Sequence, residues 1–190
     1  MNMSRRPSEE NHHIRRWFSV AFTVFIILML LANLAVIFRF SSVNREESGE
    51  MSAGVTLFLL ERIYPDYHDL SVADQAALLQ RAHKFIRKAA HFSEFALLGF
   101  LSAGLFLWVS CHFSPMSLWK TWLYPAAFSL VYATSDEIHQ IFTGRGPRVT
   151  DVLIDFAGAC FGILLIQGIS WLLARRKGRK HNIEKNEKEE

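Results

Sequence analysis

Three short segments of the sequence bring acidic, basic and imidazole groups together at helical spacing. Lys88, His91 and Glu94 recur every three residues, so on a helix they share one face. In a second segment, Asp136 and His139 are also three residues apart. The carboxyl and imidazole groups of such a set can transfer protons, and its cations can bind an anionic group. The pattern therefore predicts acid–base chemistry on an anionic ligand, or recognition of that ligand.

A third segment adds further charged groups. It runs from the turn-rich residues 143–150 into a helix that carries two acidic residues four positions apart. The groups that we expect to move protons in catalysis are His91, Glu94, Asp136, Glu137 and His139. The groups that we expect to bind the substrate are Lys88, Gln140, Arg145, Arg148, Asp151 and Asp155.

Other uses of the same residues remain open. The carboxylates could join the helix ends in a polar network, in a protein that is a scaffold or binds a partner and is not an enzyme. Metal binding is less favoured, because neither His-x-x-Glu at 91–94 nor Asp-x-x-His at 136–139 is by itself a recognised metal signature. We therefore assign no metal site and name no cofactor. An ion relay is also less favoured, because no expected span carries a charge at mid-depth.

The composition around these segments is typical of a membrane protein. Apolar residues make up 51% of the 190 residues, and they gather into long blocks between clusters of charge. The formal net charge is only +3, which excludes the strongly basic balance of a nucleic-acid-binding protein. The two cysteines, Cys111 and Cys160, lie in apolar blocks at unrelated spacing, which argues against a disulfide framework.

Crossing the hydrocarbon core of a bilayer takes a helix of about 20 predominantly apolar residues. Four blocks have that length, at 18–38, 89–109, 122–142 and 152–173. The connection at 41–88 contains a short apolar segment, 51–63, which we expect on the outer membrane surface, and a helix capped by Ser71 that runs into the second span. We therefore predict an all-α integral membrane protein with about four transmembrane helices and an additional outer interfacial helical segment.

Four glycines within the expected spans indicate close packing of helices. Gly158 and Gly162 have the small-x-x-x-small spacing at which membrane helices approach each other closely. Gly99 and Gly104 lie in the second span, and we expect them to serve packing as well. We therefore assign no ligand to any of the four.

The chain divides into a basic segment at 1–16, a membrane domain at 17–174 and a charged tail at 175–190. An even number of spans puts both termini on one side, and the arginines clustered against the span ends place that side in the cytoplasm. The tryptophans agree, because indole rings prefer the membrane interface and all five fall at this end of the expected helices: Trp17, Trp108, Trp119, Trp122 and Trp171. We expect a multi-pass protein of the cell membrane with cytoplasmic termini, so the polar segments face outward.

The polar segments also resemble a known family. They read IRKAAHFSEF at 86–95, DEIHQIF at 136–142, Gly-Arg at 144–145 and DVLID at 151–155. In this order and at this spacing they are similar to the VanZ-like family of bacterial membrane proteins, named after a protein linked to resistance to teicoplanin. Teicoplanin is a glycopeptide that binds lipid-linked cell-wall precursors outside the membrane. The resemblance implies an outward-facing polar cleft that acts on or recognises an anionic lipid-linked envelope precursor, with a contribution to teicoplanin resistance.

Overall fold

The computed structural model describes residues 7–42, 45–142 and 148–189, and it describes side chains over 13–42, 54–142 and 148–179. Within these ranges the chain is helical and contains no strand. The elements are α1 (Pro7–Ser42), α2 (Arg45–Ile63), the short 3-10 helix η1 (Pro65–Asp69), α3 (Val72–His112), α4 (Leu118–Phe142) and α5 (Val149–Glu189). The predicted all-α class is therefore confirmed.

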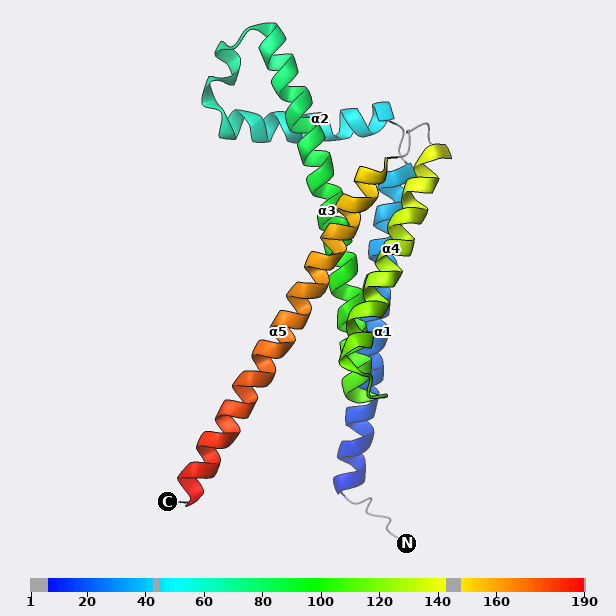
Figure 1. The fold of residues 1–190 in the computed structure, drawn as a ribbon, viewed down its shortest axis with the longest axis vertical. Helices are drawn as coiled ribbons and strands as arrows, with labels where there is room; N and C mark the ends of the chain where they lie inside the picture. Colours follow the sequence, from blue (N-terminus) through cyan, green and yellow to red (C-terminus); the bar gives the residue numbers. More distant parts are fainter. Residues whose placement is uncertain (1–6, 43–44, 143–147, 190) are drawn as a thin grey trace.

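The helices form a bundle with one helix laid across its end (Figure 1). α1, α3 and α4 run side by side, and α5 crosses α3 and then diverges from the bundle towards the end of the chain. α2 lies across the end where α1 and α4 finish and α5 begins, which we call the α2 end. α1 begins and α3 and α5 finish towards the opposite end, so α4, which follows α3 in the chain, runs back along the bundle to the α2 end.

Three helices are long and apolar enough to cross a membrane, namely those at His13–Ser42, Val72–His112 and Val149–Arg179. They contain the first, second and fourth expected spans and support a membrane protein. The third expected span, 122–142, lies in α4, which is not among these three helices. The predicted count of four is therefore not confirmed by length and composition.

The buried and the exposed residues of α4 differ in polarity. Its buried residues are Thr121, Pro125, Ser129, Ala133, Asp136, Glu137 and Gln140, which recur every three or four positions and so form one face. Its exposed residues include Leu123, Phe128, Val131 and Ile138. An average along the helix mixes the two faces, although the exposed residues are mostly apolar, with Thr134 and Ser135 as polar exceptions.

Helix boundaries in the 41–88 connection follow local backbone chemistry. α2 ends before Tyr64, because a residue that precedes proline is disfavoured in the α region, and Tyr64 has φ −127° and ψ 85°. Ser71 caps α3, since its Oγ accepts a hydrogen bond from the backbone N–H of Asp74 at 3.3 Å. From this cap α3 runs without a break to His112. The cap and the unbroken helix are as the sequence predicts.

The side chain of Gln75 attaches η1 to the start of α3. Its Nε2 donates hydrogen bonds to the backbone oxygens of Leu70 at 3.0 Å and His68 at 3.3 Å. The hydroxyl of Tyr67 donates to the backbone oxygen of Gln75 at 3.4 Å. We call α2, η1 and the part of α3 before His91 the arm.

The most extensive contact between helices joins α3 and α5. A Cβ atom added to Gly158 would overlap the backbone oxygen of Phe92, and one added to Gly162 would overlap that of Ala96. A Cβ atom on Gly99 would likewise overlap the backbone oxygen of Ala159. The backbones of the two helices therefore touch, which confirms the packing role predicted for these three glycines. Gly104 differs, because a Cβ atom there would meet only a side-chain atom of Ile166 at the ordinary distance of 3.9 Å.

A small apolar core lies beside this contact. It joins one residue or more from each of the four long helices: Ile37, Phe95, Leu98, Ala133 and Ala159. All of these side chains are fully buried. The core and the glycine contact together fix how far each helix is shifted along its neighbours.

The variant Gly162→Ala tests the backbone contact. We expect the added methyl group to lower the free energy of unfolding by about 1–3 kcal/mol, because it overlaps backbone that cannot rotate away. The measurement is the unfolding temperature of the detergent-solubilised protein. The matched control is Gly168→Ala, whose added Cβ meets nothing within 4 Å, so the unfolding temperature should not fall. Equal behaviour of the two variants would contradict the close approach of α3 and α5.

Candidate functional site

Side chains from three helices converge near the α2 end of the bundle. His91 on α3, Asp136 on α4 and Asp155 on α5 each offer one nitrogen or oxygen atom, and these atoms all lie within 4.8 Å of one another. Asp136 is 5% exposed and Asp155 is 2% exposed, while His91 is partly buried. We call these three residues the polar cluster. Each of them belongs to a different polar segment of the sequence.

Two hydrogen bonds hold the carboxyl group of Asp136. Ser41 at the end of α1 donates from its Oγ to Oδ2 of Asp136 at 2.7 Å. Gln140, one turn further along α4, donates from Nε2 to the same oxygen at 2.9 Å and to Oγ of Ser41 at 3.4 Å. All three side chains are buried. The orientation of Asp136 is therefore set by α1 as well as by its own helix.

α1 supplies site residues that the sequence analysis did not select. Besides Ser41, Asn33 is buried and donates from Nδ2 to the backbone oxygen of Glu94 at 3.5 Å. Asn33, Ile37 and Ser41 are spaced four residues apart and are all buried, so they form the face that α1 turns to the bundle. This spacing of small polar residues within an apolar block is the signal that could have identified them.

Two further carboxyl groups lie beside the polar cluster. Oε2 of Glu94 is 3.7 Å from Nδ1 of His91, which is too long for a hydrogen bond but close enough for electrostatic attraction when the imidazole is protonated. Glu137 is buried, and its Oε1 accepts a hydrogen bond from the backbone N–H of Arg148 at the start of α5. That contact ties the end of α4 to the beginning of α5.

The comparison with family models decides which proteins this chain is related to. Residues 22–173 match the model of the VanZ/LLP1 family, and this range covers more than half of the chain. The chain belongs to the VanZ/LLP1 family. The match contains every candidate site residue of this VanZ/LLP1 protein. A search of curated proteins and a search of solved structures each found no match.

Other candidates lie at the margin of the site. Nζ of Lys88 and Oδ1 of Asp151 form an ion pair of 3.8 Å between partly exposed side chains. His139 is not brought to the polar cluster: its Nε2 is 3.1 Å from Oγ of Ser42, and its ring stacks on that of Phe38. Arg148 is exposed, and its contact with Glu137 is made by its backbone. The candidate Arg145 lies outside the described residues.

The polar cluster of this VanZ/LLP1 protein has two chemical capacities. Carboxyl and imidazole groups at this separation can pass a proton between them or to a bound ligand. The same atoms could also bind a cation, and His91, Asp136 and Asp155 are the residues placed to hold a metal ion. The Lys88–Asp151 pair is more exposed, so its ammonium group is available to an anionic ligand at the rim.

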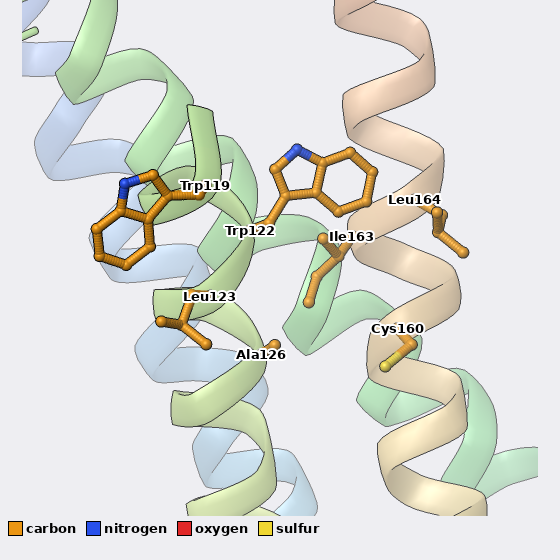
Figure 2. A pocket seen from close by; sticks show the side chains of 7 residues that line it. All are labelled: Trp119, Trp122, Leu123, Ala126, Cys160, Ile163 and Leu164. Atoms are coloured by element: carbon orange, nitrogen blue, oxygen red, sulfur yellow. The ribbon is translucent and has the colours of Figure 1, made fainter. Parts of the chain in front are cut away.

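An apolar groove lies further along the two helices that carry Asp136 and Asp155. Its volume is about 680 Å³, and it is lined by Trp119, Trp122, Leu123 and Ala126 of α4 and by Cys160, Ile163 and Leu164 of α5. Figure 2 shows the indole ring of Trp122 extending from α4 towards α5. Cys160 is five residues after Asp155, roughly 8 Å along the helix axis. Along α5 the groove therefore begins between one and two helical turns from Asp155, whereas along α4 its nearest residue, Ala126, is almost three turns from Asp136.

Near the Trp119 end of the groove, a buried glutamine joins the two helices. Nε2 of Gln167 donates hydrogen bonds to the backbone oxygen of Thr121 at 3.0 Å and to its Oγ1 at 3.3 Å. A polar side chain buried between apolar helices in this way stabilises their association. The groove is thus bounded by a polar link at one end and approaches the polar cluster at the other.

Replacing Ser41 tests the support of Asp136. In the variant Ser41→Ala, we expect the free energy of unfolding to fall by about 1–3 kcal/mol, because a buried carboxyl oxygen loses a hydrogen-bond donor. The matched control is Ser93→Ala, since Ser93 is exposed and bonds only to the backbone of its own helix. Thermal unfolding in detergent is the measurement. If Ser93→Ala lowers the unfolding temperature as much as Ser41→Ala does, the buried hydrogen bond stabilises the fold no more than an exposed one.

Proposed function

We propose that this VanZ/LLP1 protein is a multi-pass cell-membrane protein whose polar cluster faces outward and acts on or recognises an anionic lipid-linked precursor of the cell envelope. The observation that carries the proposal is the convergence of His91, Asp136 and Asp155 from three helices, in a chain of this family. Ionisable groups within the membrane cost free energy, so they are rare there and commonly mark functional sites.

The groove supports the lipid part of the proposed ligand. It is lined almost entirely by apolar side chains and approaches the polar cluster along α4 and α5. An amphiphile with its head group at the cluster and its chain between the two helices would match both surfaces. Lys88 at the rim, together with Arg145 and Arg148, would bind the anionic group of the head.

The polar cluster supports acid–base chemistry on that head group. In this mechanism His91 and Asp136 transfer protons, and Glu94, at 3.7 Å from His91, stabilises the protonated imidazole. Glu137 positions the start of α5 through its bond to Arg148. Gln140 holds the Asp136 carboxyl group in place through its hydrogen bond, and Asp155 contacts the ligand.

A non-enzymatic role has its own support. The hydrogen bonds among Ser41, Asp136 and Gln140 join α1 to α4, so the same side chains hold the helices together. In a scaffold or partner-binding protein that would be their whole role. The two functions differ in what they require of Asp136, because helix packing needs hydrogen bonding there while proton transfer needs a carboxyl group.

We further propose that α4 is the fourth transmembrane helix and that both termini are cytoplasmic. Most exposed side chains of α4 are apolar, which suits contact with lipid, and the exposed Thr134 bonds to the backbone oxygen of Leu130 in its own helix. In addition, all five tryptophans lie towards the end of the bundle opposite α2, because they occur early in α1 and α4 and late in α3 and in the apolar part of α5. Rings gathered at one end match a single membrane interface.

Labelling of single cysteines tests this topology. In a chain with Cys111→Ser and Cys160→Ser, the variants Asp66→Cys and Lys177→Cys place a thiol at exposed positions near opposite ends of the molecule. We expect a membrane-impermeant maleimide to label Asp66→Cys in intact cells and Lys177→Cys only after permeabilisation. Labelling of both in intact cells would mean an even number of spans between them and would contradict a membrane-spanning α4, and the reverse pattern would mean the opposite orientation.

Susceptibility to teicoplanin tests the function itself. In a sensitive Gram-positive host, we expect the parent protein to raise the minimum inhibitory concentration several-fold. Asp136→Asn should return it to the value of the empty vector, because the amide keeps the size of the side chain but cannot transfer a proton. The matched control Asp66→Asn changes an exposed residue of η1 and should protect as the parent does.

The outcomes separate the two candidate functions when membrane levels of all variants are equal. Loss of protection in Asp136→Asn alone favours chemistry or charge recognition at the polar cluster. Protection retained by Asp136→Asn favours the scaffold. No protection by the parent would remove teicoplanin resistance from the proposed function.

A further inference from the structure

We propose that the polar cluster is a binding site for one divalent transition-metal ion, held by His91, Asp136 and Asp155. The proposal concerns the same side chains as the proposed function, and a bound ion would make His91 and Asp136 ligands in place of proton-transfer groups. Binding of the ion itself is measured without any envelope ligand. Sequence spacing did not favour a metal, because it paired His91 with Glu94 and Asp136 with His139. The structure instead combines one residue from each of three helices.

The geometry of the three ligand atoms suits a metal ion. Bonds of zinc to imidazole nitrogen and carboxylate oxygen measure about 2.0–2.2 Å, which puts the ligand atoms of a tetrahedral site roughly 3.4 Å apart. The atoms of the polar cluster lie within 4.8 Å of one another before any ion is present. Small rotations of His91 and of the Asp155 carboxyl group close the remaining distance. The backbones need not move, because α3 and α5 are already in contact.

The surroundings of Asp136 are those of an oriented metal ligand. Its Oδ2 accepts both hydrogen bonds described above, from Ser41 and from Gln140. Such outer hydrogen bonds fix the direction of a carboxylate ligand and are a regular feature of metal sites in proteins. Both of these hydrogen bonds go to Oδ2, so neither involves the other oxygen, Oδ1.

Unsatisfied oxygen atoms around the cluster give a second observation that points to a cation. In the part of the chain that the structure describes, Asn33 Oδ1, Glu94 Oε2 and Glu137 Oε2 are buried and accept no hydrogen bond. Asn33 and Glu137 are themselves 6% and 5% exposed. Two of these atoms are carboxyl oxygens and the third is an amide oxygen, and a bound cation can satisfy acceptors of this kind.

The ligand types favour Zn²⁺ or Mn²⁺ over other ions. One imidazole with two carboxylates is a nitrogen–oxygen set of intermediate hardness, whereas Ca²⁺ and Mg²⁺ prefer oxygen ligands alone. Three protein ligands leave at least one coordination position open, as in catalytic zinc sites. An anionic oxygen of the head group could occupy that position, and this use of the ion rests on the proposed function.

Metal binding by the purified full-length protein tests the proposal. The protein is purified in detergent through a tag without histidine, treated with EDTA, dialysed, and then titrated with Zn²⁺ alone. We expect one Zn²⁺ per chain after further dialysis, measured by elemental analysis, and a higher unfolding temperature with the ion than without it. A parallel titration with Mn²⁺ shows which of the two ions binds more tightly.

Variants connect the ion to the three residues. His91→Gln and Asp155→Asn should each weaken binding by at least about tenfold, because a ligand is lost at nearly constant side-chain volume. The matched control His112→Gln changes an exposed histidine near the other end of α3, which contacts only its own helix through Trp108, and should bind as the parent does. Gel filtration and circular dichroism establish that each variant is folded.

Two results would overturn the proposal. The first is a parent protein that retains neither Zn²⁺ nor Mn²⁺, which is decisive whether or not the variants fold. The second is binding that His91→Gln and Asp155→Asn leave unchanged, which would place the ion elsewhere. Because no envelope precursor enters this experiment, its failure is distinct from a failure of the teicoplanin test.

Discussion

The direct contact between the backbones of α3 and α5 is the constraint on which the rest of the structure depends. Lipid tails are as apolar as the side chains of a helix, so burying apolar side chains contributes little to the association of membrane helices. Close van der Waals packing contributes much of the favourable free energy instead. Gly99, Gly158 and Gly162 make that packing possible, because each lacks the Cβ atom that would collide with the facing helix. The contact also fixes the axial register of the pair, which sets His91 beside Asp155.

α4 shows that a helix with several polar residues can still face lipid when those residues lie on its buried side. Its buried face carries two carboxyl groups and an amide, while its exposed face is mostly apolar. Ser41 of α1 satisfies one carboxyl oxygen and the N–H of Arg148 satisfies another, so each acid is tied to a neighbouring helix. Gln167 repeats the arrangement at the other end of α4. Polar groups thus specify the partners of α4, whereas glycines specify those of α3.

Much of the fold is readable from the sequence because it depends on local chemistry. The helical blocks, the cap at Ser71, the unbroken α3 and three of the packing glycines each follow from neighbouring residues. The composition of the site does not, since spacing along one helix says which residues share its face but not how that face is rotated against other helices. His139 therefore turns to Phe38 and Ser42 of α1 instead of the polar cluster. Ser41 was missed because its partner is far away in the sequence.

The length of α3 links the arm to the polar cluster. A helix from Val72 to His112 is roughly 60 Å long, about twice the thickness of the hydrocarbon core. The segment before His91 contains no proline or glycine, and hydrogen bonds of Gln75 and Tyr67 fasten η1 to its first turn. The arm and His91 are consequently parts of one rigid rod. His91 lies on the arm side of the glycine contact, one residue before Phe92, so the imidazole is joined to η1 by unbroken helix and sits directly beside the point where α3 is held against α5.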